Sequence, residues 1–247
     1  MELVEIVEGV EAIEGLPAVK VEGYVVIADL HLGYEEAMAR EGVFLPRVQL
    51  RNALVVLRRL SRVKARRLIV AGDIKHAFDK LLKSERAETR RFLEEALTVF
   101  SEVLVLRGNH DNYISGVVKE TGADFIEELY IKIGDIHVTH GHKDPGEYGR
   151  VIILGHEHPA IQVRVAGSRV KFPVFLKVPL EGGSTAIVLP ATGTYQTGNI
   201  VGAQRSLYLS PIIKHRGLVE EALPYIMDES GKLIKLVPLS LLEEILD

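Results

Sequence analysis

The sequence predicts an α/β fold, and three observations support this. Apolar, β-rich runs at residues 24–28, 68–71 and 103–106 are separated by segments with helical periodicity. Strands that alternate with helices usually pair in parallel through right-handed crossovers. The 247 residues, 47% of them hydrophobic, can bury one sizeable core, so a single domain over residues 1–247 is expected.

Three helices are expected around these strands, at residues 34–40, 48–63 and 84–100. The second can open at Pro46, and one face of it carries Leu50, Leu54, Leu57 and Leu60. Ser84 is a candidate N-cap for the third helix. The first half of the chain therefore follows a strand–helix order that ends in the strand at 103–106.

After residue 124 the pattern changes to short strands that follow one another closely. They are expected at residues 129–133, 136–139, 151–154, 161–165, 170–178 and 186–189. Two β-rich layers with helices outside would hold both halves. The tail from about Leu218 predicts strands and a last helix over 239–245, and residues 191–203 predict an ordered loop. The run 174–178 fits either dimer pairing or core packing.

The composition excludes several classes of protein. The chain has no cysteine, which excludes disulfides, thiolate zinc sites and cysteine nucleophiles. The acidic N-terminal segment does not resemble a signal peptide, and no apolar run approaches the roughly 18 residues of a membrane helix. A cytoplasmic protein without membrane contact is expected. The net charge of −4 argues against general nucleic-acid coating, although a local basic patch remains compatible with it.

Side chains able to bind metals recur at the ends of the apolar runs. They are Asp29, His31, Asp73, Asn109, His110, Asp111, His140, His142, His156 and His158. Taken singly, such a histidine is more often a hydrogen-bonded structural residue, and such an aspartate a turn or cap residue. The run Gly-Asn-His-Asp, however, is expected by chance in only about one in a thousand chains of this length. Because ligands bind beyond the carboxyl ends of strands in open α/β sheets, we expect the set to meet at one edge.

The chemistry of this set predicts a centre with two metal ions. Neutral imidazoles, carboxylates and one amide oxygen suit divalent ions such as Mn²⁺, Fe²⁺, Zn²⁺ or Co²⁺. Seven candidate ligands exceed the four of one tetrahedral zinc site. Two ions roughly 3.5–4 Å apart with a bridging carboxylate account for the number better, and such pairs catalyse phosphoryl displacement.

The motif order resembles that of the calcineurin-like metallophosphoesterase family. The motifs D-x-H, G-D, G-N-H-D, H-G-H and G-H-x-H begin at Asp29, Gly72, Gly108, His140 and Gly155, within residues 24–160. The segments ADLHLGYE and GDIKH are most similar to an archaeal branch of that family, which also resembles the DNA-ligase-associated phosphoesterases. Many members carry an acidic residue three positions after the G-D aspartate, whereas this chain has His76 there.

The resemblance implies a four-layer α/β/β/α sandwich and a set of residue roles. One ion would be held by Asp29, His31, Asp73 and His158, and the second by Asp73, Asn109, His140 and His156. Both would be divalent ions, Mn²⁺ in first place, with Fe²⁺, Zn²⁺, Co²⁺ or Ni²⁺ as alternatives. A hydroxide bridging the two ions would attack phosphorus, and His110 would contact the scissile phosphate and assist the leaving group. Asp111 would either orient His110 or serve as a turn residue.

The expected activity is hydrolysis of phosphate esters, with phosphodiesters favoured. Phosphomonoester hydrolysis, or a non-catalytic metal-binding subunit of a DNA-processing complex, are the alternatives. A metallo-β-lactamase site is excluded because GHEHPA lacks the following Asp-His. The substrate could be a nucleotide or a nucleic acid, and the oligomeric state stays open.

Several further residues are candidates for substrate contact. Eight basic residues without an intervening acid lie between Arg47 and Arg67; they could follow a nucleic-acid backbone, but a solvated helix face is the favoured interpretation. Other candidates, each of which could equally be a packing or surface residue, are Tyr34, Tyr113, Tyr148, Lys75, Lys143 and Arg150.

Overall fold

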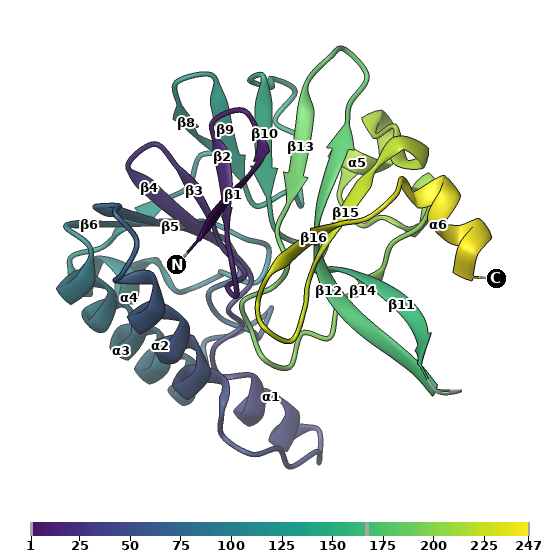
Figure 1. Ribbon diagram of the computed structural model, residues 1–247. Coiled ribbons are helices and arrows are strands. Elements are labelled where there is room, and N and C mark those ends of the chain that lie inside the picture. Colours follow the sequence, from purple (N-terminus) through teal and green to yellow (C-terminus); the bar gives the residue numbers. More distant parts are fainter. Residues whose placement is uncertain (1, 166–167, 247) are drawn as a thin grey trace.

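The computed structural model describes residues 2–165 and 168–246, which form two β-sheets with helices on their outer faces (Figure 1). The outermost residues of the predicted domain, 1 and 247, lie outside the described part. The α/β class and the four-layer α/β/β/α order predicted from the sequence are both confirmed. None of the helices in the described part of the chain is long and apolar enough to span a membrane.

The first sheet has seven strands in sequence order. They are β1 (Leu3–Val7), β2 (Val10–Ile13), β3 (Val19–Val21), β4 (Tyr24–Ile27), β5 (Arg67–Ala71), β6 (Glu102–Leu106) and β7 (Asp124–Ile126). The strands from β4 to β7 pair in parallel, as predicted for the first three apolar runs. The antiparallel strands β1–β3 and the edge strand β7 were not predicted, because they are short and several carry charged residues that hide their periodicity.

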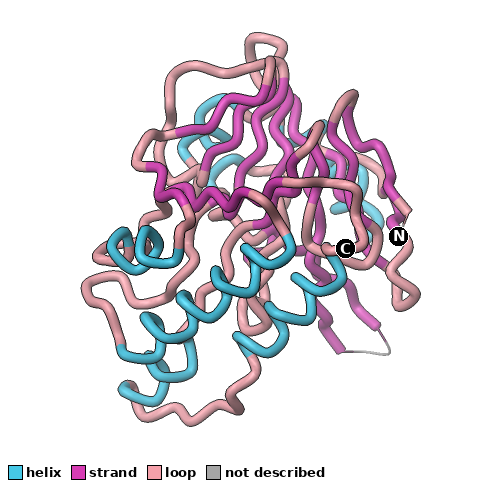
Figure 2. Tube along the Cα trace, turned by 90° about the vertical axis from the view of Figure 1, so that its left-hand side faces the viewer, coloured by secondary structure: helices cyan, strands magenta, loops and turns pink. Residues whose placement is uncertain are grey.

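Four helices follow the strands of this sheet. They are α1 (Tyr34–Arg40), α2 (Gln49–Leu60), α3 (Lys83–Val99) and α4 (Ser115–Thr121). Figure 2 shows helices gathered outside the strands. The apolar stripe of α2 is confirmed, since Leu57 and Leu60 are buried beside Phe92 of α3 and Val117 of α4. Helix α4 was missed because seven residues give too little periodicity.

The predicted helix starts were wrong in two places. Helix α2 begins at Gln49, where the Glu35 carboxylate accepts the backbone N–H groups of Val48 and Gln49, so Pro46 does not open it. Helix α3 begins one residue before Ser84, and Glu85 accepts the N–H of the preceding Leu82. In both cases a glutamate side chain supplies the acceptor that the free N–H groups of a helix start require.

The second sheet contains the strands of the second half. They are β8 (Tyr130–Ile133), β9 (Ile136–Thr139), β10 (Val151–Leu154), β11 (Pro159–Val165), β12 (Ser168–Pro179), β13 (Thr185–Val188), β14 (Asn199–Ile200), β15 (Leu223–Met227) and β16 (Leu233–Lys235). The six strands predicted between 129 and 189 are confirmed within two residues. Strands β9, β10 and β13 are parallel neighbours, and β11 with β12 forms a long hairpin that projects at the lower right of Figure 1.

The outer face of this sheet is covered by short helices. They are α5 (Pro211–Arg216) and α6 (Leu239–Leu246); one 3₁₀ turn, Arg205–Leu207, precedes α5, and another, Val219–Glu221, follows it. The last helix was predicted and α5 was not. Residues 191–203 form a loop, as predicted, except that Asn199 and Ile200 pair as the short strand β14.

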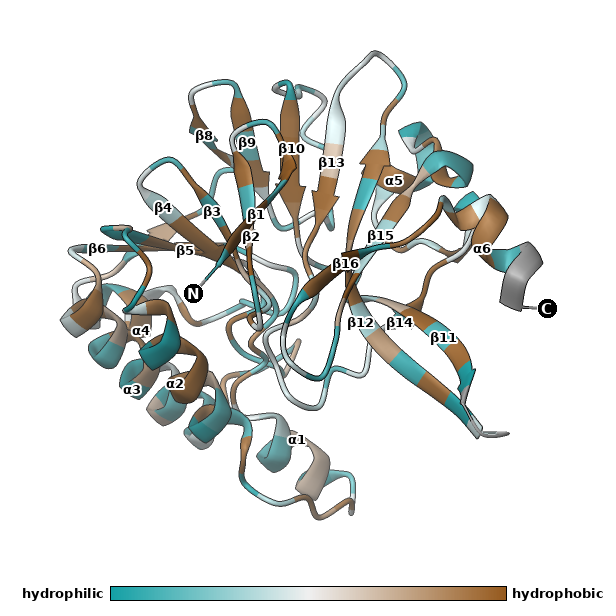
Figure 3. Cartoon of the chain, in the orientation of Figure 1, coloured by the Kyte–Doolittle hydropathy of each residue, from teal (hydrophilic) through white to brown (hydrophobic). Residues whose placement is uncertain are grey.

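Three buried clusters separate the four layers. One lies between α2–α4 and the first sheet, a second between the two sheets, and a third between the second sheet and α5 and α6. Alternation along single strands explains this arrangement: Val25 and Ile27 face the helices, whereas Val26 and Ala28 face the other sheet. Figure 3 shows both sheets as largely hydrophobic. The run 174–178 is part of these clusters, so core packing rather than an exposed dimer edge explains it.

Candidate metal centre

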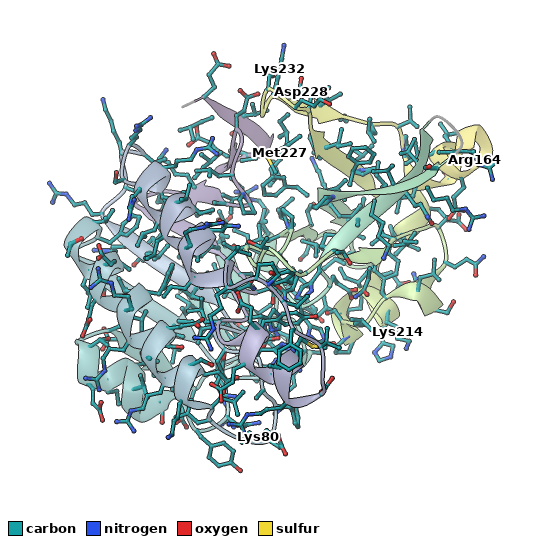
Figure 4. All side chains as sticks on the ribbon, turned by 90° about the horizontal axis from the view of Figure 1, so that it is seen from below. Lys80, Arg164, Lys214, Met227, Asp228 and Lys232 are labelled. Carbon is teal, nitrogen blue, oxygen red and sulfur yellow. The ribbon has the colours of Figure 1, made fainter. Side chains whose placement is uncertain are left out.

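The carboxyl ends of parallel strands from both sheets meet at one end of the molecule. The strands β4, β5 and β6 lead to the D-x-H, G-D and G-N-H-D motifs, and β9 and β10 lead to H-G-H and G-H-x-H. Figure 4 views the molecule from below, the side on which α1 lies in Figure 1, and side chains crowd its middle. The predicted meeting of the motifs at strand ends is therefore what the structure shows, although two sheets contribute instead of one.

A first group of potential ligands consists of Asp29, His31 and His158. One ligand atom of each lies within 4.8 Å of the other two. Nε2 of His158 is 3.4 Å from Oδ1 of Asp29 and 3.4 Å from Nε2 of His31. With Asp73, these are the side chains that the family resemblance assigns to one metal ion.

A second group consists of Asp73, His140 and His156, which also meet the 4.8 Å criterion. The amide oxygen of Asn109 is 3.0 Å from Nε2 of His140, so it faces the same space. Oδ2 of Asp73 is 3.4 Å from Nε2 of His140 and 3.8 Å from Nε2 of His31. Asp73 therefore lies between the two groups, where a bridging ligand would have to be.

The backbone beneath these side chains is strained. Asp29, His31, Asp73, His156 and His158 have φ values of 58°, 46°, 52°, 67° and 45°. Among the described non-glycine residues, only Glu22 and Tyr113 share such a φ. Residues held in the left-handed region cost free energy and cluster at functional sites. The strain turns each side chain sharply inward at the end of its strand.

Two motif glycines make room for the second group. A Cβ on Gly72, whose φ is +87°, would overlap the ring of His140, and a Cβ on Gly108 would overlap the side chain and backbone of Asp73. Gly72 and Gly108 are thus needed because any larger residue would collide with His140 or with Asp73, which pack directly against these two positions.

Each group has a histidine whose second ring nitrogen is held by a hydrogen bond. Nδ1 of His140 donates to the carbonyl of Ala71 at 3.0 Å, which leaves Nε2 free as a ligand. Nδ1 of His31 lies 3.3 Å from Nδ1 of His76. His76 is therefore the hydrogen-bond partner of this ring nitrogen of His31, and the tautomers of the two rings set which nitrogen donates.

His110 lies beside the two groups without belonging to the predicted ligands. Its Nδ1 donates to the carbonyl of His76, and its Nε2 is 3.9 Å from Oδ2 of Asp73. Its backbone N–H donates to Oδ1 of Asp73 at 3.0 Å. His110 with His31 and His76 also forms a third cluster of potential ligand atoms. The free Nε2 is placed to meet a group bound over the metal centre.

Asp111 has different partners from the one expected. Its two carboxylate oxygens accept backbone N–H groups from Gly108, Asp73, Ile74 and Lys75 at 2.8–3.3 Å. No hydrogen bond joins it to the His110 ring in the described part of the chain. Asp111 thus ties the G-N-H-D loop to the G-D loop, which agrees with the turn-residue interpretation.

The charges of the site suit metal ligation. Burial alone would raise the pKa of Asp73, but the neighbouring His140 and His31 hold this pKa well below its usual range. Burial lowers the pKa of His31 to about 3 and that of His156 to about 4. In His140, burial acts to lower the pKa, yet Asp73 and Asp29 outweigh it and raise the pKa to about 9. At neutral pH an ionised Asp73 thus faces the neutral rings of His31 and His156, whereas the His140 ring holds an extra proton that a divalent ion would have to displace.

A loop of the second half completes the site, and sequence reasoning did not place it there. The N–H groups of Thr192 and Gly193 donate to the carbonyls of Ala28 and Asp29, both at 2.9 Å. The buried Gln49 side chain donates to Leu30 and accepts from residue 194. This loop follows β13 just as the other motifs follow their strands, which was the available signal.

Three of the six other candidate substrate contacts have structural partners elsewhere. The Lys75 ammonium is buried and donates to the carbonyls of Ala77 and Lys80. Tyr148 bonds Asp144, and Arg150 pairs with Asp135. The remaining candidates Tyr34, Tyr113 and Lys143 lie at least partly exposed beside metal motifs.

The last residue of the basic run lies away from this end of the molecule. All eight basic residues are exposed, and the last, Arg67, begins β5 at the end opposite Asp73. Arg67 pairs with Glu102 and bonds Tyr24, both at strand starts. The favoured interpretation as a solvated helix face agrees with this placement.

Comparisons with known proteins identify the fold and the family of this chain. Among solved structures, the nuclease MPE of Pseudomonas putida matches with a TM-score of 0.65 at 19% identity, over 95% of this chain and 99% of that chain. Yfce, a phosphoesterase from E. coli, matches with a TM-score of 0.44 at 16% identity, over 87% and 98%. No curated protein matched. A family model described as calcineurin-like phosphoesterase matches residues 24–160, which include all the motifs, and the chain belongs to this family.

Proposed function

We propose that this protein is a metal-dependent phosphodiesterase with a centre of two divalent ions, Mn²⁺ in first place. The position of Asp73 carries the proposal, because its Oδ2 faces a histidine of each ligand group. The first ion would be held by Asp29, His31, Asp73 and His158, and the second by Asp73, Asn109, His140 and His156. Ions held there supply charge neutralisation and a water of lowered pKa.

The protein's own residues have separate tasks in this proposal. His110 directs Nε2 toward the reacting phosphate, because its Nδ1 proton is held by the carbonyl of His76. From there it would stabilise the extra charge and give a proton to the leaving ester oxygen. Asp111 acts through the backbone, by fixing the two loops that carry Asp73 and Asn109.

Two features favour catalysis over a non-catalytic binding role. Every predicted ligand position is filled, and His110, which is not needed as a ligand, lies beside the centre. A subunit that binds metal without catalysing a reaction would need the ligands but not His110. Diesters are favoured over monoesters because the family resemblance leans toward them; the similarity to the archaeal, DNA-ligase-associated branch stays a prediction, as does a nucleotide or nucleic-acid substrate.

The test is hydrolysis of bis-p-nitrophenyl phosphate beside p-nitrophenyl phosphate by metal-stripped protein refilled with Mn²⁺. Diester turnover that needs Mn²⁺ is the expected result. Monoester turnover alone would replace the diester assignment. No turnover of either ester, with metal bound, would contradict catalysis on simple esters and favour the subunit of a DNA-processing complex.

The role of His110 has its own test. The His110→Asn variant should keep its bound Mn²⁺, while turnover falls by about 10²–10⁴, the usual effect of removing a general acid. Metal content is measured by mass spectrometry of the protein after gel filtration. Loss of metal from the variant would make His110 a ligand and contradict the assignment.

A further inference from the structure

A cavity of about 300 Å³ opens directly beside the second ligand group. Gly108 and Asn109 of the G-N-H-D motif form part of its wall, and His142 and Lys143 form another part. This volume is at the lower end for pockets that bind small molecules. A larger cavity of about 480 Å³, between β11, β12 and α6, contains none of the metal-site residues in its lining.

An exposed aromatic ring, Phe78, lines the cavity on the side of His110. Its side chain is 57% exposed, and its ring meets that of His110 edge to face, with centroids 5.8 Å apart and an interplanar angle of 89°. Asn112 fixes the local backbone by donating to the Phe78 carbonyl at 3.0 Å. Lys80, two residues further on, lies at the lower edge of the molecule when it is seen from below (Figure 4). A large apolar ring held in water contributes little to folding, but it offers a surface on which a planar group can stack.

The polar lining of the cavity is mixed in charge. The guanidinium of Arg107 donates to the Asn112 amide oxygen at 2.9 Å, and Glu127 and Glu128 lie on the exposed rim. Nδ1 of His142 is buried and has no hydrogen-bond partner in the described part of the chain. The negative charges of Glu127 and Glu128 at the rim repel any additional phosphate group at that place. Donors and acceptors of both kinds suit the edge of a nucleobase.

We infer that this cavity binds the nucleoside on the leaving side of the scissile phosphate, with its base stacked on Phe78. His110 lies between this ring and Asp73, so the ester oxygen that receives its proton is the one attached to that nucleoside. In the step, an oxygen from water forms a new bond to phosphorus and releases one proton to solvent, the bond from phosphorus to the nucleoside oxygen breaks, and that oxygen takes a proton from Nε2 of His110, whose ring carries protons on both nitrogens before the step. This inference rests on the proposed function and names its substrate class as nucleoside phosphodiesters.

The test compares two ligands that share a phosphate and a sugar. Calorimetry on Mn²⁺-loaded protein measures the affinity for adenosine 5′-monophosphate and for ribose 5-phosphate. The wild type should bind the nucleotide about tenfold more tightly or better, the usual contribution of stacking one base. Phe78→Ala should bring the two affinities close together, whereas Phe78→Tyr should restore the preference.

Phe44→Ala is the matched control, because Phe44 is 84% exposed and contributes nothing to this cavity. That variant should keep the full preference for the nucleotide, and Phe78→Ala should bind Mn²⁺ as the wild type does. Equal affinities for both ligands in the wild type, or an unchanged preference in Phe78→Ala, would overturn the inference. These binding results are independent of bis-p-nitrophenyl phosphate turnover, so failure of the proposed activity is recognised separately.

Discussion

The two ligand groups of the metal centre are built alike but are supported differently. In the group of Asp73, His140 and His156, the ring of His140 is held by a backbone carbonyl, that of Ala71. In the group of Asp29, His31 and His158, the ring of His31 meets a side chain, His76. A backbone carbonyl is present whatever the sequence, whereas a side-chain partner can be changed by one substitution. The support of the group that contains His31 can therefore be altered by a single substitution, whereas the support of His140 cannot.

The largest effect is expected for Asp73→Asn, because this substitution would weaken metal binding by both ligand groups and so remove the difference between them. The amide cannot supply the negative charge that two ions would share, so Mn²⁺-dependent diester turnover should fall by about 10³ or more. Asp135→Asn is the control, because Asp135 is exposed and pairs only with Arg150 in the described structure. Mass spectrometry should find both ions reduced in Asp73→Asn; two ions bound at wild-type affinity would contradict a bridging position.

His76→Ala should separate the two groups. Removal of an outer hydrogen-bond partner usually lowers metal affinity by about 10–100-fold, and here only the group that contains His31 should lose it. Titration with Mn²⁺, followed by electron paramagnetic resonance, would then show one weakened and one unchanged site. His76→Asp should recover much of the loss, since a carboxylate can accept the same proton. Equal weakening of both sites would remove the distinction drawn between them.

Gly108→Ala tests the residue against which the shared aspartate packs. The added Cβ would overlap Asp73, so we expect a loss of about 1–3 kcal/mol in the free energy of unfolding, together with weaker binding of both ions. Gly116→Ala is the matched control, since nothing lies near a Cβ there and the residue is part of α4. Urea unfolding should show that this control is neutral or slightly stabilised. A Gly108→Ala variant as stable as the wild type would mean that the G-N-H-D loop can shift away from Asp73 at little cost in free energy.

The smallest effect concerns protons. Below a pH of about 9, the His140 ring carries a second proton that a metal ion must displace, whereas the His31 ring, with a pKa of about 3, is neutral and keeps only one. Calorimetry at pH 7.5 in buffers of different ionisation enthalpy should therefore detect release of about one proton from His140. Asp29 also raises the pKa of His158, which adds to the release. Release that is unchanged in His140→Ala would contradict this protonation state.

The same pKa values give the metal-free protein a defined pH dependence. His31, with a pKa near 3, and His156, with a pKa near 4, bind protons less readily when folded than when unfolded. Their contribution makes stability fall as the pH drops from about 6.5 toward 4. The raised pKa of His140 acts oppositely: its contribution is complete below about 6.5 and is lost as the pH rises through about 9. Thermal unfolding of metal-stripped protein between a pH of about 4 and a pH of about 9 measures the loss of stability at low pH and the loss at high pH.

The sequence determined much of this protein by itself. Strand and helix positions in the motif-bearing half followed from local periodicity, and the candidate ligand residues followed from motifs only two to four residues long. Such signals are local, so they survive without knowledge of the fold. Short elements such as β1, β3 and α4 escaped because a few residues, several of them charged, carry too little periodicity.

Only the tertiary structure decided how these pieces support one another. His31 and His158 are 127 residues apart in the chain, and Asp111 reaches the N–H of Asp73 over 38. The outer position of His76, the true partners of Asp111, and the contact of residues 192–193 with the strand that carries Asp29 all depend on such distant pairings. The physical reason is that periodicity and motif spacing report on neighbours along the chain, whereas hydrogen-bond partners and pKa values are set by neighbours in space.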